Sequence, residues 1–374
     1  MKAALRPVAV IGSGSFLPND PVPNSKLDEV LGHLDQAPPK VRKFMENIGP
    51  VILQRSGVEH RHFAIDPKTH KLTHTLASLA EVAARRALEA GGRDPNDVDL
   101  LLVACPVCDY STPPTSAVLQ ERLGIKYCAE MEIHSNCSGV GKCMQIAFDA
   151  LRSGRYKTAL VTYSQLSSVY VRSCYFNQAH MTKTQAALRY ILADGSGAVL
   201  LEARDDPAPG SHELIGTHVE SIGFDRKAGM TAGGGVVDLV DPERQIPGMF
   251  ESGSHHLDQD FTAVNNDAVP TLVLGVRRML DSLGVDPCQV DHYVYSIPGR
   301  QLYDGNLDKV TKPFGVTPER VKFRASDTGY CGGASLLVHF DEIVRSGELK
   351  AGQTAVVYSM ESSKWMSGGF VVRW

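Results

Sequence analysis

The sequence repeats itself once, and this repeat constrains the fold more than any other feature. Residues 86–99 (RALEAGGRDPNDVD) match residues 278–291 (RMLDSLGVDPCQVD) at seven positions with a constant offset of 192. The same offset returns where Phe148-Asp149 matches Phe340-Asp341. Agreement at one offset in separated segments is typical of a duplicated unit. We therefore predict that the chain consists of two fused copies of one domain.

Both copies show the same order of elements. A helix with apolar side chains near every 3.6 residues ends at a glycine, and a short apolar strand follows it. A second helix then begins at a cluster of small residues, and another buried strand follows. Strands that alternate with helices indicate parallel sheets covered on both faces. We expect an α/β protein with five layers, α/β/α/β/α, formed by an N-terminal half over residues 1–205 and a C-terminal half over residues 206–374. The expected helices and strands include 76–90 and 100–104 in the first half, and 269–283 and 293–296 in the second.

The duplication also predicts where a functional site lies. Ligands of α/β folds bind at the C-terminal ends of strands and the N-terminal ends of helices. A doubled domain brings two such ends together, so the loops around residues 137 and 329 are expected to face one shared site. Cys137 lies there, where a helix begins after a strand. The positive helix end favours a thiolate, and free backbone N–H groups can hold an oxyanion. A small buried residue in a packed turn explains the same pattern, and both interpretations stay open on this feature alone.

Composition excludes several other classes of protein. Lys and Arg total 38 against 42 Asp and Glu, a net charge of -4, which disfavours a nucleic-acid binder and a polybasic membrane anchor. No apolar run approaches the ~20 residues of a membrane helix, and the N-terminal apolar stretch is too short for a signal peptide. Eight cysteines are too few for a disulfide scaffold, which favours free thiols and a cytoplasmic location. Cys105 and Cys108 form a CxxC without the second ligand pair of a zinc site, so no metal is expected.

Several segments carry a family resemblance. They include AVIGSGSFLPND at 9–20, DYSTPPTSAVLQERLGI at 109–125, NCSGVGKCMQIAFDALRSG at 136–154 and the C-terminal FVVRW. Over nearly its whole length the chain resembles the ketoacyl-ACP synthase III branch of the thiolase superfamily. The resemblance implies a thiolase fold, a homodimer and no permanently bound cofactor. It also implies an acyl-CoA or acyl carrier protein (ACP) thioester as donor, whose acyl group becomes attached to Cys137.

The chain departs from this family at four functional positions. Ser296 lies where the family has its catalytic His, and Tyr330 lies where it has its catalytic Asn. The glycine-rich loop that helps to shape the family's oxyanion hole reads ESSK here, at 361–364. The tryptophan that many members stack on adenine corresponds to Val51, which favours a carrier-protein donor over free coenzyme A. Ser296 and Tyr330 can still donate hydrogen bonds, although both are neutral.

Other residues are candidates for the missing functions. His180 lies in an expanded segment and can act as a replacement base, and Asp327 can orient a base or substrate or cap a turn. Ser363, Lys364 and Arg55 are candidates for the oxyanion site or for contacts to the phosphate of a carrier arm.

These changes favour an altered second half-reaction. Loss of one oxyanion donor typically costs about 10²–10³ in rate, so loss of the His and the Asn disfavours a decarboxylative condensation. We expect an acyltransferase that passes its acyl group to a small-molecule amine, hydroxyl or thiol, or an atypical condensing enzyme, in fatty-acid-like, polyketide or other specialised metabolism. The alternatives are a standard 3-oxoacyl-ACP synthase III condensation, a non-catalytic subunit of a ketosynthase-like heterodimer, and a binding protein for an acyl-carrier arm.

Overall fold

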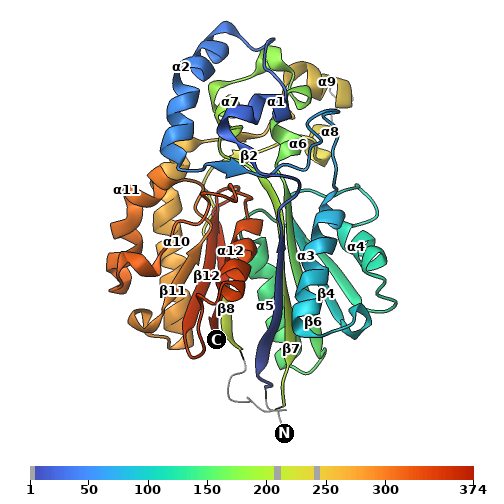
Figure 1. The fold of residues 1–374 in the computed structure, drawn as a ribbon, viewed down its shortest axis with the longest axis vertical. Helices are drawn as coiled ribbons and strands as arrows, with labels where there is room; N and C mark the ends of the chain where they lie inside the picture. The colour runs from blue at the N-terminus through green and yellow to red at the C-terminus, as the bar shows by residue number, and fades with distance from the viewer. Residues whose placement is uncertain (1–4, 206–211, 240–244) are drawn as a thin grey trace.

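The computed structural model describes residues 5–205, 212–239 and 245–374, and a single sheet of nine strands forms its centre (Figure 1). The N-terminal half contributes β1 (Val8–Phe16), β4 (Leu100–Cys105), β5 (Ala129–His134), β6 (Thr158–Leu166) and β7 (Asp194–Ala203). The C-terminal half contributes β8 (Glu213–Ser221), β11 (His292–Tyr295), β12 (Thr354–Glu361) and β13 (Met366–Arg373). The order across the sheet is β11-β12-β13-β8-β1-β7-β6-β4-β5.

The strand order reads the same way outward from the middle of the sheet. From β1 it runs to β7, β6 and β4, and from β8 it runs to β13, β12 and β11. The two runs meet where Ala9 pairs with Glu213 and where Val10 N donates to His212 O at 2.7 Å. The predicted boundary between residues 205 and 206 borders residues 206–211, which lie outside the described part of the chain.

The expectation of purely parallel sheets is wrong. Strand β4 is parallel to β5 and β6, and β11 is parallel to β12, but β7 and β13 are antiparallel to their neighbours. The reason lies in the connections. Strand β13 follows β12 after the short turn 362–365, and a short connection can join only antiparallel strands.

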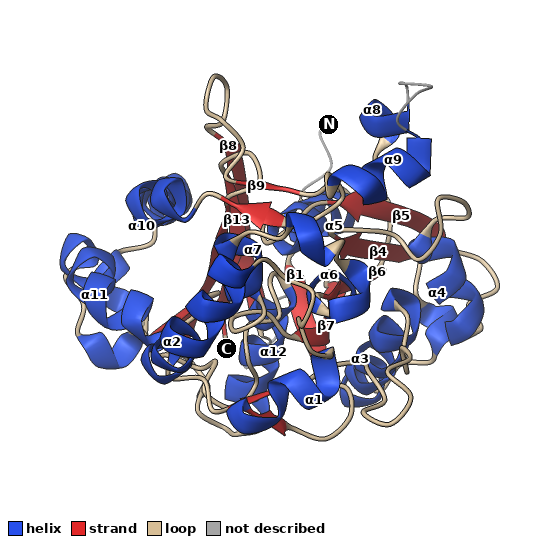
Figure 2. Cartoon of the chain, turned by 90° about the horizontal axis from the view of Figure 1, so that it is seen from above, coloured by secondary structure: helices blue, strands red, loops and turns tan. Residues whose placement is uncertain are grey.

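Helices form three layers, one on the outer face of each half and one between the strands of the two halves (Figure 2). Helices α3 (Leu76–Gly91) and α4 (Thr115–Leu123) pack on the outer face of the N-terminal strands. Helices α10 (Phe261–Leu283) and α11 (Arg300–Thr311) pack on the outer face of the C-terminal strands. Helices α5 (Gly139–Arg152) and α12 (Ala334–Arg345) lie in the core shared by the two halves. Helix α10 begins earlier than expected because the Asp260 side chain accepts from Ala263 N and caps it there.

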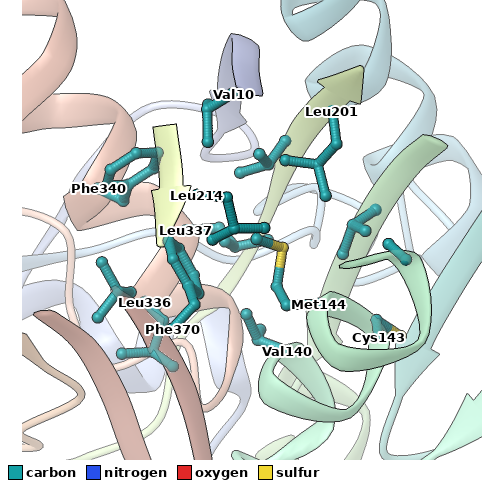
Figure 3. Packing of buried hydrophobic residues seen from close by; sticks show 14 of the residues in the cluster. Val10, Val140, Cys143, Met144, Leu201, Leu214, Leu336, Leu337, Phe340 and Phe370 are labelled. Carbon is teal, nitrogen blue, oxygen red and sulfur yellow. The ribbon is translucent and has the colours of Figure 1, made fainter. Parts of the chain in front are cut away.

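The shared core joins the two halves through apolar side chains and close backbone packing. Figure 3 shows Val140 and Met144 of α5 near Phe370 of β13 and Leu337 of α12. A Cβ atom on Gly141 would lie 2.5 Å from the backbone of β13, so only glycine allows this approach of helix and strand. The helix that follows Cys137 is therefore held directly against the C-terminal half.

A cap covers one end of the sheet (Figure 1). Its helices are α1 (Leu27–Leu31), α2 (Pro39–Ser56), α6 (Ser168–Val171), α7 (Lys183–Leu188), α8 (Val236–Leu239) and α9 (Gln245–Ser252). It also contains two pairs of short strands, β2 (Val22–Pro23) with β3 (His60–Arg61) and β9 (Met230–Thr231) with β10 (Asp258–Gln259). Buried Arg189 links its parts, donating to Val171 O and Gly32 O at 2.6 Å and to Asp28 Oδ1 at 2.8 Å. Within the three described stretches, no helix combines the length and apolar character needed to cross a membrane.

Candidate active site

Cys137 lies in the short turn between β5 and α5. Asn136 O accepts from Gly139 N at 2.9 Å, and Ser138 O accepts from Lys142 N at 3.1 Å, so the turn leads directly into the helix. A Cβ atom on Gly139 would lie 3.0 Å from Ala104 and from the Tyr163 ring, which explains the small residue after the turn. The Cys137 side chain remains partly exposed. Backbone constraints thus place the thiol at the first turn of a buried helix.

Tyr330 reaches the thiol from the C-terminal half. Its hydroxyl lies 3.3 Å from Cys137 Sγ. The backbone before it turns at Gly329, whose φ of 71° favours glycine, and Tyr330 O accepts from Ala193 N at 2.9 Å. The expectation that the loops around residues 137 and 329 face each other is therefore met.

Ser296 lies behind Tyr330, just beyond the end of β11. Its Oγ donates to Gly332 O at 2.9 Å and is in hydrogen-bonding contact with the Tyr330 hydroxyl. The structure thus brings Cys137, Tyr330 and Ser296 into one chain of polar groups. Within the described residues, no imidazole is hydrogen-bonded to the thiol. The arrangement supplies hydroxyl donors where a histidine would supply a base.

Burial dominates the acid–base properties of the site. Burial, with a smaller contribution from the charge of nearby Glu361, raises the pKa of the Cys137 thiol to about 11 against the opposing hydrogen bonds from Tyr330 and Ser359. Burial and the nearby thiol also hold the Tyr330 pKa well above its ordinary value. Burial and the nearby carboxylate therefore oppose the thiolate that the helix end favours.

Glu361 is the site residue that sequence reasoning missed. It ends β12, is 2% exposed and accepts from Ser138 N at 3.1 Å. Its position in the loop that differs from the family was visible in the sequence. Its contact with the residue after Cys137 was not, because the two positions are 223 residues apart.

Two of the candidate residues lie on the surface away from the thiol. His180 is exposed in the cap, where it packs against Gly253. Asp327 is also exposed and pairs with His60, with Oδ1 and Nδ1 3.6 Å apart. Glu59 adjoins this pair, and the three ligand atoms lie within 4.8 Å of one another on open surface. The contacts of His180 and Asp327 give neither residue a role as a base for Cys137.

The remaining candidates lie on two segments, the turn that follows β12 and helix α2. The Ser363 hydroxyl donates to Glu361 Oε1 and is therefore engaged in the carboxylate network. Lys364 is exposed, and its ammonium donates to Arg226 O. Arg55 is exposed in the last turn of α2. Val51 lies one turn earlier on this helix, so the two side chains share a face.

Comparison with known proteins adds a family context. The chain matches two family models: 3-oxoacyl-[acyl-carrier-protein] synthase III over residues 131–223, and the C-terminal domain of the same synthase over residues 280–374. A β-ketoacyl-[acyl-carrier-protein] synthase III of Methylococcus capsulatus is 28% identical over 348 residues, which cover 93% of each protein.

Solved structures share the fold. The tetronic acid condensing enzyme AbyA1 superposes with a TM-score of 0.77 and 24% identity, over 98% of this chain and 100% of that one. The priming β-ketosynthase of the R1128 polyketide pathway superposes with a TM-score of 0.76 and 23% identity, over 99% of this chain and 96% of that one. Together with the observed layers, these likenesses confirm the predicted α/β thiolase fold.

Proposed function

Because the chain belongs to the ketoacyl-ACP synthase III-like branch of the thiolase superfamily, we propose that it is an acyltransferase with a covalent acyl-Cys137 intermediate. Enzymes of this family use acyl-CoA or acyl-ACP substrates and need no permanent cofactor. The observation that supports the proposal is the 3.3 Å contact between Cys137 Sγ and the Tyr330 hydroxyl, at the junction of the two halves. The placement of a nucleophile beside a neutral donor suits acyl transfer.

In the loading step, Cys137 attacks the carbonyl carbon of the donor thioester. A new C–S bond forms, the C–S bond to the coenzyme A or carrier arm breaks, and the leaving thiolate receives the proton that Cys137 loses. The tetrahedral intermediate carries a negative oxygen close to the attacked carbon, and the Tyr330 hydroxyl is near enough to Sγ to donate to it. A hydrogen bond with Ser296 orients the Tyr330 hydroxyl.

In the second step, an acceptor replaces Cys137 on the acyl carbon. An amine, hydroxyl or thiol acceptor attacks with its own lone pair, the C–S bond to Cys137 breaks, and the departing thiolate takes up the proton that the acceptor loses, so no carbanion needs to be stabilised. Neutral Tyr330 and Ser296 are suited to this reaction better than to a decarboxylative condensation. We place the product in fatty-acid-like or polyketide metabolism, and the name of the R1128 relative supports the second of these.

Two alternative functions remain specific enough to test. The words "condensing enzyme" and "priming β-ketosynthase" in the relatives' names favour a condensation, with Tyr330 and Ser296 as oxyanion donors. The raised pKa of Cys137 favours a non-catalytic subunit of a heterodimer instead. Retention of the thiol beside a hydroxyl donor supports the acyltransferase over this second alternative.

We assign the approach of the donor to the rim of the cap. The exposed face of α2 that holds Val51 and Arg55 is suited to a carrier arm, because Arg55 can pair with its phosphate and Val51 offers no stacking ring. Lys364 is a second cation for this arm, whereas Ser363 already donates to Glu361. The eight free cysteines agree with a cytoplasmic location.

We also propose a homodimer formed through β5. This strand ends the sheet and pairs only with β4 among the described residues, and it presents the exposed side chain of Met131. An unpaired edge of this kind is a template for another strand. Sedimentation velocity is expected to give a dimer of the single chain. A monomer that dimerises only with a second ketosynthase-like chain would instead support the heterodimer.

Intact-protein mass spectrometry tests the proposed function. The protein is incubated with a panel of acyl-CoA and acyl-ACP thioesters, beside Cys137→Ala and the control variant Cys128→Ala. We expect a mass increase equal to one acyl group in the native protein and in Cys128→Ala, and none in Cys137→Ala. If none of the donors gives an adduct, the acyltransferase is refuted and the search turns to a partner subunit.

A further inference from the structure

Glu361 binds both serines that flank Cys137. Its Oε2 atom accepts from Ser135 Oγ at 2.8 Å, from Ser138 Oγ at 2.6 Å and from Ser138 N at 3.1 Å. Ser363 donates to the other carboxylate oxygen. The turn that carries the thiol is therefore bound on both sides by one buried carboxylate from the opposite half of the protein.

Lys142 is the cation that accompanies this carboxylate. Its ammonium donates to Ser135 Oγ at 2.8 Å, so Ser135 links Lys142 to Glu361. Lys142 lies one turn into α5, on the same helix that begins after Cys137. A buried carboxylate is costly without such partners, and this one has three hydroxyl donors, one N–H donor and a nearby cation. Hydrogen bonds and Lys142 accordingly lower the pKa of Glu361 despite its burial, so it is ionised at neutral pH.

An ionised carboxylate at this place has two consequences for Cys137. It uses the Ser138 N–H at the start of the helix, which would otherwise be free to bind an anion of the substrate. It also opposes a second negative charge on the neighbouring thiol. The charged and titratable groups around the thiol are Glu361 from β12, Lys142 from α5, Tyr163 from β6 and Tyr330.

We propose that Glu361 is the positioning residue of the nucleophile, fixing the turn around Cys137 and keeping the resting thiol protonated, with Lys142 as its counter-ion. The inference rests on the proposed role of Cys137 as the acyl carrier. It predicts a nucleophile that is held in place but has low reactivity in the free protein. At a thiol pKa of about 11, about one molecule in a thousand holds a thiolate at pH 8.

The test measures alkylation of Cys137 by iodoacetamide without any acyl donor, so it is independent of the proposed acyl transfer. Trypsin releases Cys137 in a peptide over residues 127–142, which also holds Cys128 as an internal reference. Glu361→Gln keeps an oxygen acceptor and removes the charge. We expect about tenfold faster alkylation of Cys137 at pH 8 and a pH profile shifted by about one unit to lower pH. Glu202→Gln, at a buried carboxylate near the end of strand β7, is the matched control and is expected to leave the profile unchanged.

Lys142→Met provides the opposite change; because it removes a tryptic site, Cys137 is then read in the longer peptide over residues 127–152. Removal of the ammonium leaves the carboxylate less compensated, so alkylation of Cys137 is expected to slow several-fold. The inference is overturned if the Cys137 profile of Glu361→Gln is unchanged or moves to higher pH. If Glu361→Gln does not fold, an unchanged or faster reaction in Lys142→Met overturns it equally.

Discussion

Replacing Tyr330 by phenylalanine removes one hydroxyl and keeps the aromatic ring. The ring packs against an apolar cluster formed largely by residues of the cap, so the fold is expected to persist. The lost hydroxyl lies 3.3 Å from Cys137 Sγ and opposes the rise in the thiol pKa. A hydrogen bond to a charged group contributes about 1.5–3 kcal/mol, which corresponds to about 10–100-fold less thiolate at a given pH. If Tyr330 also donates to the thioester oxyanion, the rate of acyl loading falls by about 10²–10³.

Two rates separate these effects. The first is alkylation of Cys137 by iodoacetamide, which reports only on the thiolate. The second is acyl loading from the best donor, followed by quenching and intact mass spectrometry. If the rate of acyl loading falls further than the rate of alkylation, Tyr330 donates to the oxyanion. If both rates fall equally, Tyr330 acts only on the thiolate.

Tyr303→Phe is the matched control. It removes a hydroxyl that donates to Val321 O at 2.7 Å in another part of the C-terminal half. Both rates are expected to stay at the native level in this variant. A Tyr330→Phe protein that loads acyl groups within twofold of the native rate would refute the role of the hydroxyl.

Two further predictions concern stability. Gly141→Ala places a methyl group 2.5 Å from the backbone of β13, and we expect it to lower the free energy of unfolding by at least about 3 kcal/mol in urea denaturation. Gly305 lies inside α11 with open space around it, so we expect Gly305→Ala to raise the free energy of unfolding by about 0.5–1 kcal/mol. Equal effects of the two substitutions would contradict the close packing. Burial raises the pKa of Glu348, but hydrogen bonds from Arg324 and Lys322 outweigh it and lower that pKa to about 2. The ionised Glu348 therefore stabilises the native state above the unfolded pKa of about 4.3, and this stabilisation is lost as the pH falls toward 2. We expect Glu348→Gln to lower the free energy of unfolding by about 2 kcal/mol at pH 7 and by progressively less below pH 4.5. A loss independent of pH would contradict this assignment.

The sequence predicts the frame of this protein well because the frame is repeated. Matching segments at one offset identify paired helices and strands, and symmetry then brings residues 137 and 330 together. Sequence reasoning fails where contacts depend on side chains of distant segments. The contact between Glu361 and Ser138 is an example, since no local pattern marks it.

The cap shows the same limit. Its helices come from several separate segments, so their mutual packing, and the exposed place of His180 within it, do not follow from periodicity. The forces that oppose a thiolate at Cys137 are hidden from the sequence for a related reason. The helix end is visible in the sequence, but the burial of the thiol and the approach of a carboxylate are not.

The connection between β6 and β7 has an evolutionary consequence. Leu166 and Asp194 pair directly in the sheet, so residues 167–193 leave the frame and return at neighbouring positions. A segment with adjacent ends can change in length and sequence while the strands below it keep their register. This one segment of the cap can therefore diversify without the rest of the frame, and its two ends are natural junctions for grafting the corresponding segment of a relative.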